Sequence, residues 1–261
     1  MTERERIEAV LKRQKPDIVP WATRLDIWYG SLTKTGTLPE EYQSLDIMKI
    51  YEDLGIGRQS YVHIALSKLH GVDVTAEFNG KVIFSEHAPV LRFPLVTALV
   101  PRSEPGITVF TFKTPAGTLT MQYKTNKELI EGYSNPYMMK HLVENDDDYK
   151  VLGWVLDHIE IVADYEAFHQ REAEIGDNGF AIGFLDRPPF QRMLLDFLGE
   201  VYTFYQMFDN PKQFNKLLDQ LSALNKEYIR IGKEFPGLML ECPDNIDGNI
   251  TNPNFFTQYI V

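Results

Sequence analysis

Short apolar runs alternate along the chain with longer segments whose apolar positions recur at helical spacing. Four of the apolar runs are bounded by turn residues and are typical of buried strands. These strands are predicted at residues 18–22, 56–64, 179–184 and 238–242. Helices are predicted between and around them at residues 2–14, 39–54, 146–163 and 211–234. The alternation of strands and helices predicts an α/β fold with a parallel sheet, whose functional groups gather at the carboxyl ends of the strands.

Residues 72–124 interrupt this alternation. Asn79-Gly80 joins two runs with period-two patterning, and Asn-Gly is the strongest short hairpin signal because both turn positions favour positive φ. A second hairpin is predicted from 107–113 and 119–123, joined by a turn that contains Pro115 and Gly117. We therefore expect an antiparallel β-hairpin insertion over residues 72–124.

Composition and charge exclude several classes of partner. The net charge of −11 disfavours a nucleic-acid partner, because phosphate binding needs a basic face. The sequence contains no apolar run long enough to span a membrane, and its first ten residues lack the apolar region of a secretory signal. A single cysteine, Cys242, is typical of a reducing compartment. The expectation is a cytoplasmic protein with no membrane or nucleic-acid partner.

Several stretches of the sequence resemble one family. The opening residues 2–7, followed by Lys15-Pro16-Asp17-Ile18-Val19-Pro20, resemble the start of the uroporphyrinogen decarboxylase superfamily, which also contains the corrinoid-dependent methyltransferases. Further similarity lies, in the same order as in the family, at residues 113–119, 183–190, 209–211 and 244–246. The turn at 113–119 resembles the methyltransferase-like branch more closely.

This resemblance implies a (β/α)8 barrel with its active site at the carboxyl ends of the strands. Because only four barrel strands are predicted, we expect the chain to hold the first half to two-thirds of such a barrel. Residues 1–261 would then form one partial barrel domain that carries the insertion at 72–124. A helix start at Thr251 or Asn252 with no stop signal before Val261 favours the same interpretation. The chain would be a fragment, a split barrel completed by a complementing chain or a homo-oligomer, or a remnant.

The resemblance implies methyl transfer between a small methylated compound, or a thiol, and a corrinoid protein. The superfamily's decarboxylases hold their substrate carboxylates with an arginine-rich stretch after the first strand. Only Arg24 occupies that stretch here, so a substrate with eight carboxylates fits poorly. Decarboxylation of a tetrapyrrole is the first alternative. The second is a non-catalytic truncated barrel that acts as a binding partner.

Candidate substrate-binding residues lie where the predicted strands end: Arg24, Asp26, Tyr61, His63 and Asp186. Each has a structural alternative. Arg24 could pair with Asp26 or Glu52 in the scaffold, Asp186 could pair with Arg187, and His63 could be a structural histidine. Asp244 and Asn245, which end the fourth strand, are the candidate catalytic residues, because an aspartate there could take or hold a proton. They could instead cap the helix that begins near residue 251.

A zinc site is implied by the resemblance rather than by the residues themselves. The methyltransferase branch binds zinc through histidine and cysteine on later strands, which would lie beyond Val261. This chain has six scattered histidines and no His-x-Cys or Cys-x-x-Cys pattern. Glu241 and Cys242 could each add one ligand to a zinc ion in a longer protein. Alternatively, Cys242 is a small buried apolar residue.

Overall fold

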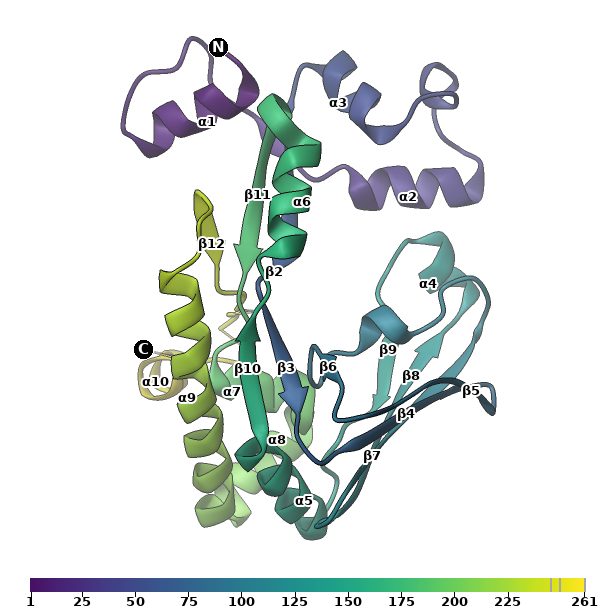
Figure 1. Cartoon of the computed structure of the whole chain (residues 1–261), viewed down its shortest axis with the longest axis vertical. Helices are drawn as coiled ribbons and strands as arrows, with labels where there is room; N and C mark the ends of the chain where they lie inside the picture. The colour runs from purple at the N-terminus through teal and green to yellow at the C-terminus, as the bar shows by residue number, and fades with distance from the viewer. Residues whose placement is uncertain (245, 249, 261) are drawn as a thin grey trace.

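The computed structural model describes residues 1–244, 246–248 and 250–260 and contains three sheets. A four-stranded parallel sheet lies toward the amino-terminal helices, and a five-stranded antiparallel sheet lies at the far side of the molecule (Figure 1). A three-stranded antiparallel sheet lies between them. We refer to these as the parallel sheet, the insertion sheet and the bridging sheet.

The parallel sheet confirms the predicted α/β class. Its strands are β1 (Ala22–Thr23), β2 (Gly57–His63), β11 (Gly179–Phe184) and β12 (Met239–Glu241), and all three neighbouring pairs are parallel. Their order across the sheet is β1-β2-β11-β12, which is also their order along the chain. Within the described residues the sheet is open and does not close into a barrel. The first strand is shorter than predicted, because Ile18 and Val19 are exposed and precede it.

Helices α2 (Asp26–Thr35) and α3 (Ile47–Leu54) connect β1 to β2. The sequence did not predict α2, and the predicted helix at 39–54 is wrong as one unit, because it consists of the 3₁₀ turn η1 (Glu40–Tyr42) and α3. Asp46 separates them by capping α3, where its carboxylate accepts a hydrogen bond from the Lys49 amide at 3.0 Å. Helix α6 (Glu166–Ile175) covers one face of the parallel sheet, and Phe168 packs there with Ala181.

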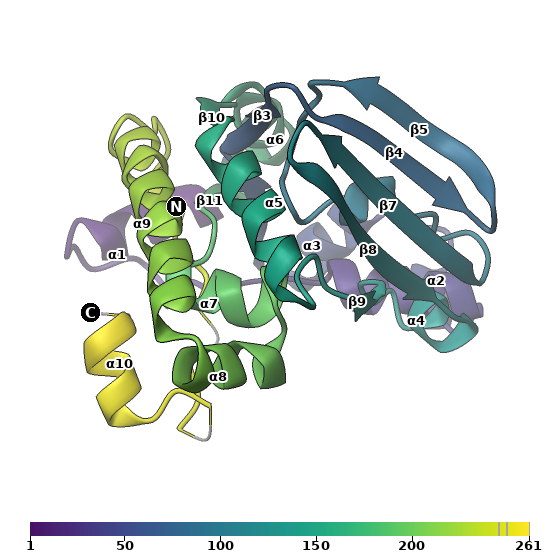
Figure 2. The ribbon, with the colours of Figure 1, turned by 90° about the horizontal axis from the view of Figure 1, so that it is seen from below.

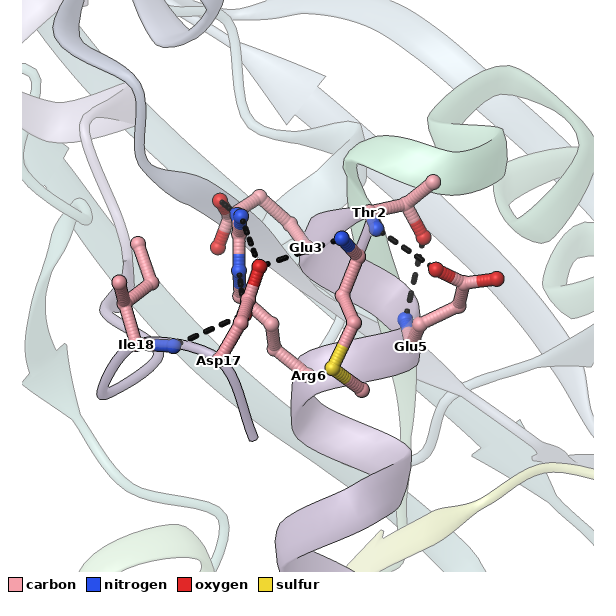
Figure 3. Close-up of polar contacts among 7 residues, drawn as sticks. Thr2, Glu3, Glu5, Arg6, Asp17 and Ile18 are labelled. Carbon is pink, nitrogen blue, oxygen red and sulfur yellow. Dashed lines mark hydrogen bonds and ion pairs between the residues drawn. The ribbon is translucent and has the colours of Figure 1, made fainter. Parts of the chain in front are cut away.

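The first helix, α1 (Glu3–Leu11), closes the amino-terminal part of the opposite sheet face, where Ile7 packs against Phe180 and Ile182. Figure 3 shows why it begins where it does. The Glu5 amide donates to the Thr2 hydroxyl at 3.1 Å, and the Thr2 amide donates to the Glu5 carboxylate at 2.8 Å. This reciprocal cap satisfies two amides of the first turn.

The bridging sheet corrects a second prediction. Helix α5 (Asp146–Asp157) is twelve residues long, and residues 159–163 form strand β10 rather than the end of a longer helix. Strand β10 (Ile159–Ala163) pairs with β3 (Ala65–Leu69), which pairs in turn with β6 (Val90–Leu91). Ile159, Ile161 and Val162 are β-branched residues that favour a strand once a partner is available.

The insertion sheet confirms both predicted hairpins. Its order is β5-β4-β7-β8-β9, with every neighbouring pair antiparallel. The strands are β4 (Asp73–Phe78), β5 (Lys81–His87), β7 (Gly106–Thr114), β8 (Gly117–Thr125) and β9 (Tyr137–Lys140). Asn79 and Gly80 turn the first hairpin with φ values of 49° and 78°. Strand β9, which lies outside the predicted insertion, was not expected.

The largest hydrophobic core lies between the insertion sheet and a helical layer. Figure 2 shows helix α5 of this layer lying beside the insertion sheet. Phe110 and Phe112 from β7 are fully buried with Phe197 and Leu221 from the helices. The helical layer contains α5, α7 (Pro189–Arg192), the π-helical turn η4 (Met193–Phe197), α8 (Glu200–Asp209) and α9 (Pro211–Lys233). The other short elements are η2 (Thr97–Leu99), α4 (Lys127–Glu131), η3 (Gly176–Asn178) and α10 (Pro253–Tyr259).

Candidate functional site

The carboxyl ends of the four parallel strands lie at one edge of the parallel sheet. Strand β2 ends at His63, and Asp186 follows β11 by two residues. Glu241 ends β12, and Arg24 follows β1. The phenyl ring of Phe184 lies 4.9 Å from the His63 ring and 5.5 Å from the Tyr61 ring, so it separates two polar clusters at this edge. We call them the outer cluster, with Arg24, and the inner cluster, with His63.

The outer cluster is built around an ion pair. Arg24 donates from Nη2 to Asp26 Oδ2 at 2.9 Å and from Nε to Oδ1 at 3.3 Å, a fork of two parallel bonds. Burial opposes ionisation of Asp26, but the Arg24 guanidinium outweighs it and lowers the pKa of that carboxyl. The sequence suggested Asp26 or Glu52 as the partner of Arg24. Arg24 pairs with Asp26, whereas Glu52 pairs with Lys49 at 2.7 Å.

Tyr61 connects the outer cluster to the last strand. The guanidinium carbon of Arg24 lies 4.9 Å from the centre of the Tyr61 ring, within cation–π range. Burial and a hydrogen bond with the Glu241 carboxylate raise the pKa of Tyr61. The structure thus brings together four of the residues expected from the sequence: Arg24 and Asp26, which follow β1, Tyr61 of β2, and Glu241 of β12.

The inner cluster begins at His63. Arg92 donates from Nη1 to Nε2 of His63 at 2.6 Å, and from Nε and Nη2 to Asp186 Oδ1 at 3.3 and 3.2 Å. Burial, followed by the nearby Arg92 cation, lowers the pKa of His63 to about 4. His63 is therefore a neutral imidazole at neutral pH. Arg92 follows β6, so this cluster joins the parallel sheet to the bridging sheet.

Asp186 is the centre of the inner cluster. Its residue is 7% exposed, and its second oxygen lies 3.8 Å from Arg192 Nη2. Burial alone would raise the pKa of Asp186, but the guanidinium groups of Arg192 and Arg92 lower it. The Tyr228 hydroxyl donates a further hydrogen bond to this carboxylate. The sequence-based alternative that Asp186 pairs with Arg187 is wrong.

Arg187 instead pairs with Asp196 in the π-helical turn, at 3.1 Å. Burial raises the pKa of Asp196 to about 6. Arg192 is almost fully buried and donates from Nη2 to the Phe93 carbonyl at 3.0 Å. The Nε atoms of Arg187 and Arg192 are buried with no hydrogen-bond partner among the described residues. Unsatisfied guanidinium donors of this kind are costly unless a ligand or water meets them.

The inner cluster carries an excess of positive charge. Arg92, Arg187 and Arg192 supply three guanidinium groups, and Asp186 and Asp196 supply two carboxylates. With His63 neutral, these five side chains carry a net charge of +1, before the neighbouring Asp244 carboxylate is counted. Arg92 and Arg187 keep about a fifth of their side-chain surface exposed. The exposed guanidinium groups of Arg92 and Arg187 could bind an anionic small molecule at this edge of the sheet.

Cys242 and Asp244 lie beside the inner cluster. The Cys242 thiol donates to the Asp186 carbonyl at 3.7 Å, although the residue as a whole is exposed rather than buried as one alternative held. Desolvation of the sulfur and the neighbouring Asp244 and Asp186 carboxylates raise the pKa of this thiol. Asn245, the second predicted catalytic residue, lies outside the described residues.

The donor set at this edge does not fit a zinc ion. Among the residues that the structure describes, no group of three or more His, Cys, Asp or Glu side chains is placed to hold a metal. The Nε2 atom of His63 already accepts a hydrogen bond from Arg92, and a cation at that position disfavours a second cation. Glu241 ends β12 and Cys242 follows it, but Glu241 bonds Tyr61 and the Cys242 thiol bonds the Asp186 carbonyl.

Sequence reasoning missed Arg92, Arg192, Asp196 and Tyr228, which come from segments with no strand-end signal. The only available hint was the Arg187-Pro188-Pro189 run, which places Arg187 just before a helix start.

No helix in the described part of the chain is long and apolar enough to cross a membrane. Comparisons with known protein families, with curated proteins and with solved structures find no match to this chain.

Proposed function

We propose that the chain has a (β/α)8-type architecture of the uroporphyrinogen decarboxylase superfamily, and that the parallel sheet is an arc of that barrel. The strand order supports this proposal, because strands that lie side by side in sequence order are typical of a barrel, whereas doubly wound sheets reverse their order at a switch point. The position of the two polar clusters at the carboxyl edge supports it as well.

The reaction we propose is methyl transfer between a small anionic methylated compound, or a thiol, and a corrinoid protein. The observation that carries the substrate class is the partly exposed guanidinium surface of Arg92 and Arg187 at the carboxyl edge of the sheet. Arg92 and Arg187 would hold the anionic group of the substrate, and the Arg24–Asp26 pair would position its other end. Asp244 beside Cys242 would contact the reacting group. The corrinoid, held by its partner protein, would supply the cobalt chemistry that accepts or donates the methyl group.

No step of this proposal uses zinc, because the described residues do not provide a zinc ligand set. Instead, the chain contributes binding and proton control. His63 stays neutral beside Arg92, and Asp196 has a pKa of about 6, so the inner cluster can exchange a proton near neutral pH. The single cysteine supports a reducing cytoplasm as the compartment.

Decarboxylation of a tetrapyrrole or similar polycarboxylate is the second candidate. The specific observation that favours it is that the structure adds Arg92, Arg187 and Arg192 to Arg24, the one arginine that the sequence offered. Guanidinium groups hold substrate carboxylates in two-bond geometry. Asp196, protonated below about pH 6, could supply the proton that replaces the departing carbon dioxide.

One pair of assays separates the two candidates. Methyl transfer is followed by the absorbance change of methylcobalamin in the presence of the protein and a small thiol, and decarboxylation by the carbon dioxide released from uroporphyrinogen. Arg92→Gln should abolish whichever activity is present. Arg230→Gln, on an exposed part of α9, is the matched control and should leave it unchanged. If neither activity is found with the intact protein, the non-catalytic alternative is favoured.

A further inference from the structure

A cavity lies away from the inner cluster, between α2, β2 and α6. It has a volume of about 640 Å³, which is within the range of small-molecule sites. Its lining includes Lys34 from α2, Arg58 and Ser60 from β2, Arg171 from α6, and Tyr133. We call it the α2 cavity. It contains none of the inner-cluster residues.

Three of the side chains that line the α2 cavity are cationic, in a protein whose net charge is −11. Arg58 is the most informative of them. It is partly buried, and no carboxylate oxygen of the described residues lies within 4 Å of its guanidinium nitrogens. Its hydrogen bond is to the sulfur of Met48, at 2.9 Å from Nη1. A thioether is a weak acceptor, so most of the donors of Arg58 lack a strong partner in the described structure.

The other two cationic side chains that line the cavity come from α2 and α6. Lys34 makes no ion pair with a described residue. Arg171 bonds Glu174 at 3.3 Å on the surface of α6, an exposed pair of the kind that contributes little to stability. The one carboxylate in the cavity wall belongs to Asp26, and both of its oxygens are bonded to Arg24. The α2 cavity therefore has a clear excess of positive charge.

The wall opposite α2 is held in place by one close contact. Tyr133 follows the end of α4 with a φ of 52°, a conformation that costs a non-glycine residue about 1–2 kcal/mol. Its ring lies directly against Gly30 of α2, where a Cβ atom would come within 2.6 Å of the ring. This contact holds helix α2 and the end of α4 together at one side of the cavity.

We propose that the α2 cavity binds the phosphate group of a small phosphate monoester. Such a group carries close to two negative charges at pH 7 and offers three acceptor oxygens. Cations from three separate elements match a tetrahedral dianion better than a planar carboxylate, which one guanidinium fork would satisfy. The hydroxyl groups of Ser60 and Thr33, which also line the cavity, are further donors for phosphate oxygens. The α2 cavity adjoins the outer cluster through Asp26, but phosphate binding there does not depend on the reaction proposed above.

The test is calorimetric titration of the intact protein with inorganic phosphate at constant ionic strength. Saturable binding is expected, and a phosphorylated hexose should bind while the same hexose without phosphate should not. Arg58→Gln should weaken phosphate binding at least about tenfold, because a charge-assisted hydrogen bond is lost. Arg171→Gln, on an exposed side chain, should weaken it several-fold with no change in thermal stability.

Arg230→Gln is the matched control, because it removes one exposed arginine from a distant helix and changes the net charge equally. Its phosphate affinity should equal that of the unchanged protein. The proposal is overturned if phosphate shows no saturable binding, or if Arg230→Gln weakens it as much as Arg171→Gln does. If Arg58→Gln does not fold, the comparison of Arg171→Gln with Arg230→Gln decides.

Discussion

Nη1 of Arg92 lies 2.6 Å from Nε2 of His63, and this contact defines the tautomer of the His63 imidazole. A guanidinium can only donate, so Nε2 must be the acceptor and the imidazole proton must reside on Nδ1. His63 is therefore a neutral, oriented imidazole that ends a parallel strand beside the Asp186 carboxylate. The sequence identified His63 as a candidate but not the arginine that controls it.

His63 should remain neutral down to about pH 4, because burial and the Arg92 cation both disfavour imidazolium. The measurement is an NMR titration of the imidazole carbon-bound protons. In Arg92→Gln the cation is removed while a donor amide remains, so the pKa of His63 should rise. An unchanged pKa in that variant would show that burial alone depresses it.

His63 and Asp196 should make opposing contributions to the pH dependence of the free energy of unfolding. Between about pH 4 and 6.5 the unfolded chain binds a proton at His63 that the folded chain does not, so this group lowers stability as the pH falls. Between 3.8 and about 6 the folded chain holds a proton on Asp196 that the unfolded chain releases, so this group raises stability as the pH falls. Each effect is roughly 3 kcal/mol at its limit, so they nearly cancel.

Single variants should separate the contributions of His63 and Asp196 to the free energy of unfolding. On acidification from pH 7 to 4.5, His63→Gln should gain stability relative to the unchanged protein, and Asp196→Asn should lose it. Urea unfolding at the two pH values gives the comparison. Curves that stay parallel for all three proteins would contradict the assignment of both groups.

Loss of the Asp186 carboxylate should destabilise the fold strongly. Asp186→Asn leaves the cations of Arg92 and Arg192 without their shared partner in a buried site, which costs about 3–5 kcal/mol. Asp26→Asn breaks a matched but exposed arginine pair and should cost at most about 1 kcal/mol. Chemical denaturation of both variants measures the difference. Equal losses would mean that Asp186 is not the centre of the cluster.

Cys242 should react slowly with thiol reagents at neutral pH. Its pKa is raised by desolvation and by the neighbouring carboxylates of Asp244 and Asp186, so little thiolate is present. Asp244→Asn removes one of these charges and should speed alkylation by iodoacetamide at pH 8, with the rate still rising toward alkaline pH. A rate that is already at its plateau at pH 7 in the unchanged protein would exclude a raised pKa.

Two glycine substitutions should have opposite effects. In Gly30→Ala the new methyl group meets the ring of Tyr133 at about 2.6 Å, which should cost about 1–3 kcal/mol in overpacking. In Gly153→Ala the methyl group meets only Gln220, at 3.4 Å, and helix α5 should gain up to about 1 kcal/mol. Thermal unfolding distinguishes the two. Combining Gly30→Ala with Tyr133→Ala should recover part of the loss if the ring is the obstacle.

The sequence by itself determined the elements whose signals are local. The Asn79-Gly80 turn and the apolar run at 179–184 were read correctly because turn chemistry and continuous apolar character require no distant partner. Helix α9 was predicted within one residue, since Pro211 begins it and one apolar face runs along it. The parallel, strand-and-helix character of the fold followed from the same local patterns.

Only the tertiary structure decided the rest. Residues 159–163 continue a helical spacing, but they form a strand because β3 offers an edge to pair with. Arg92 reaches His63 from 29 positions away along the chain, and Arg192 reaches Asp186 only because helix α7 follows β11. No spacing rule connects such positions. Ion pairs between distant segments depend on which surfaces pack together, and that is settled by burial of the whole chain rather than by any one segment.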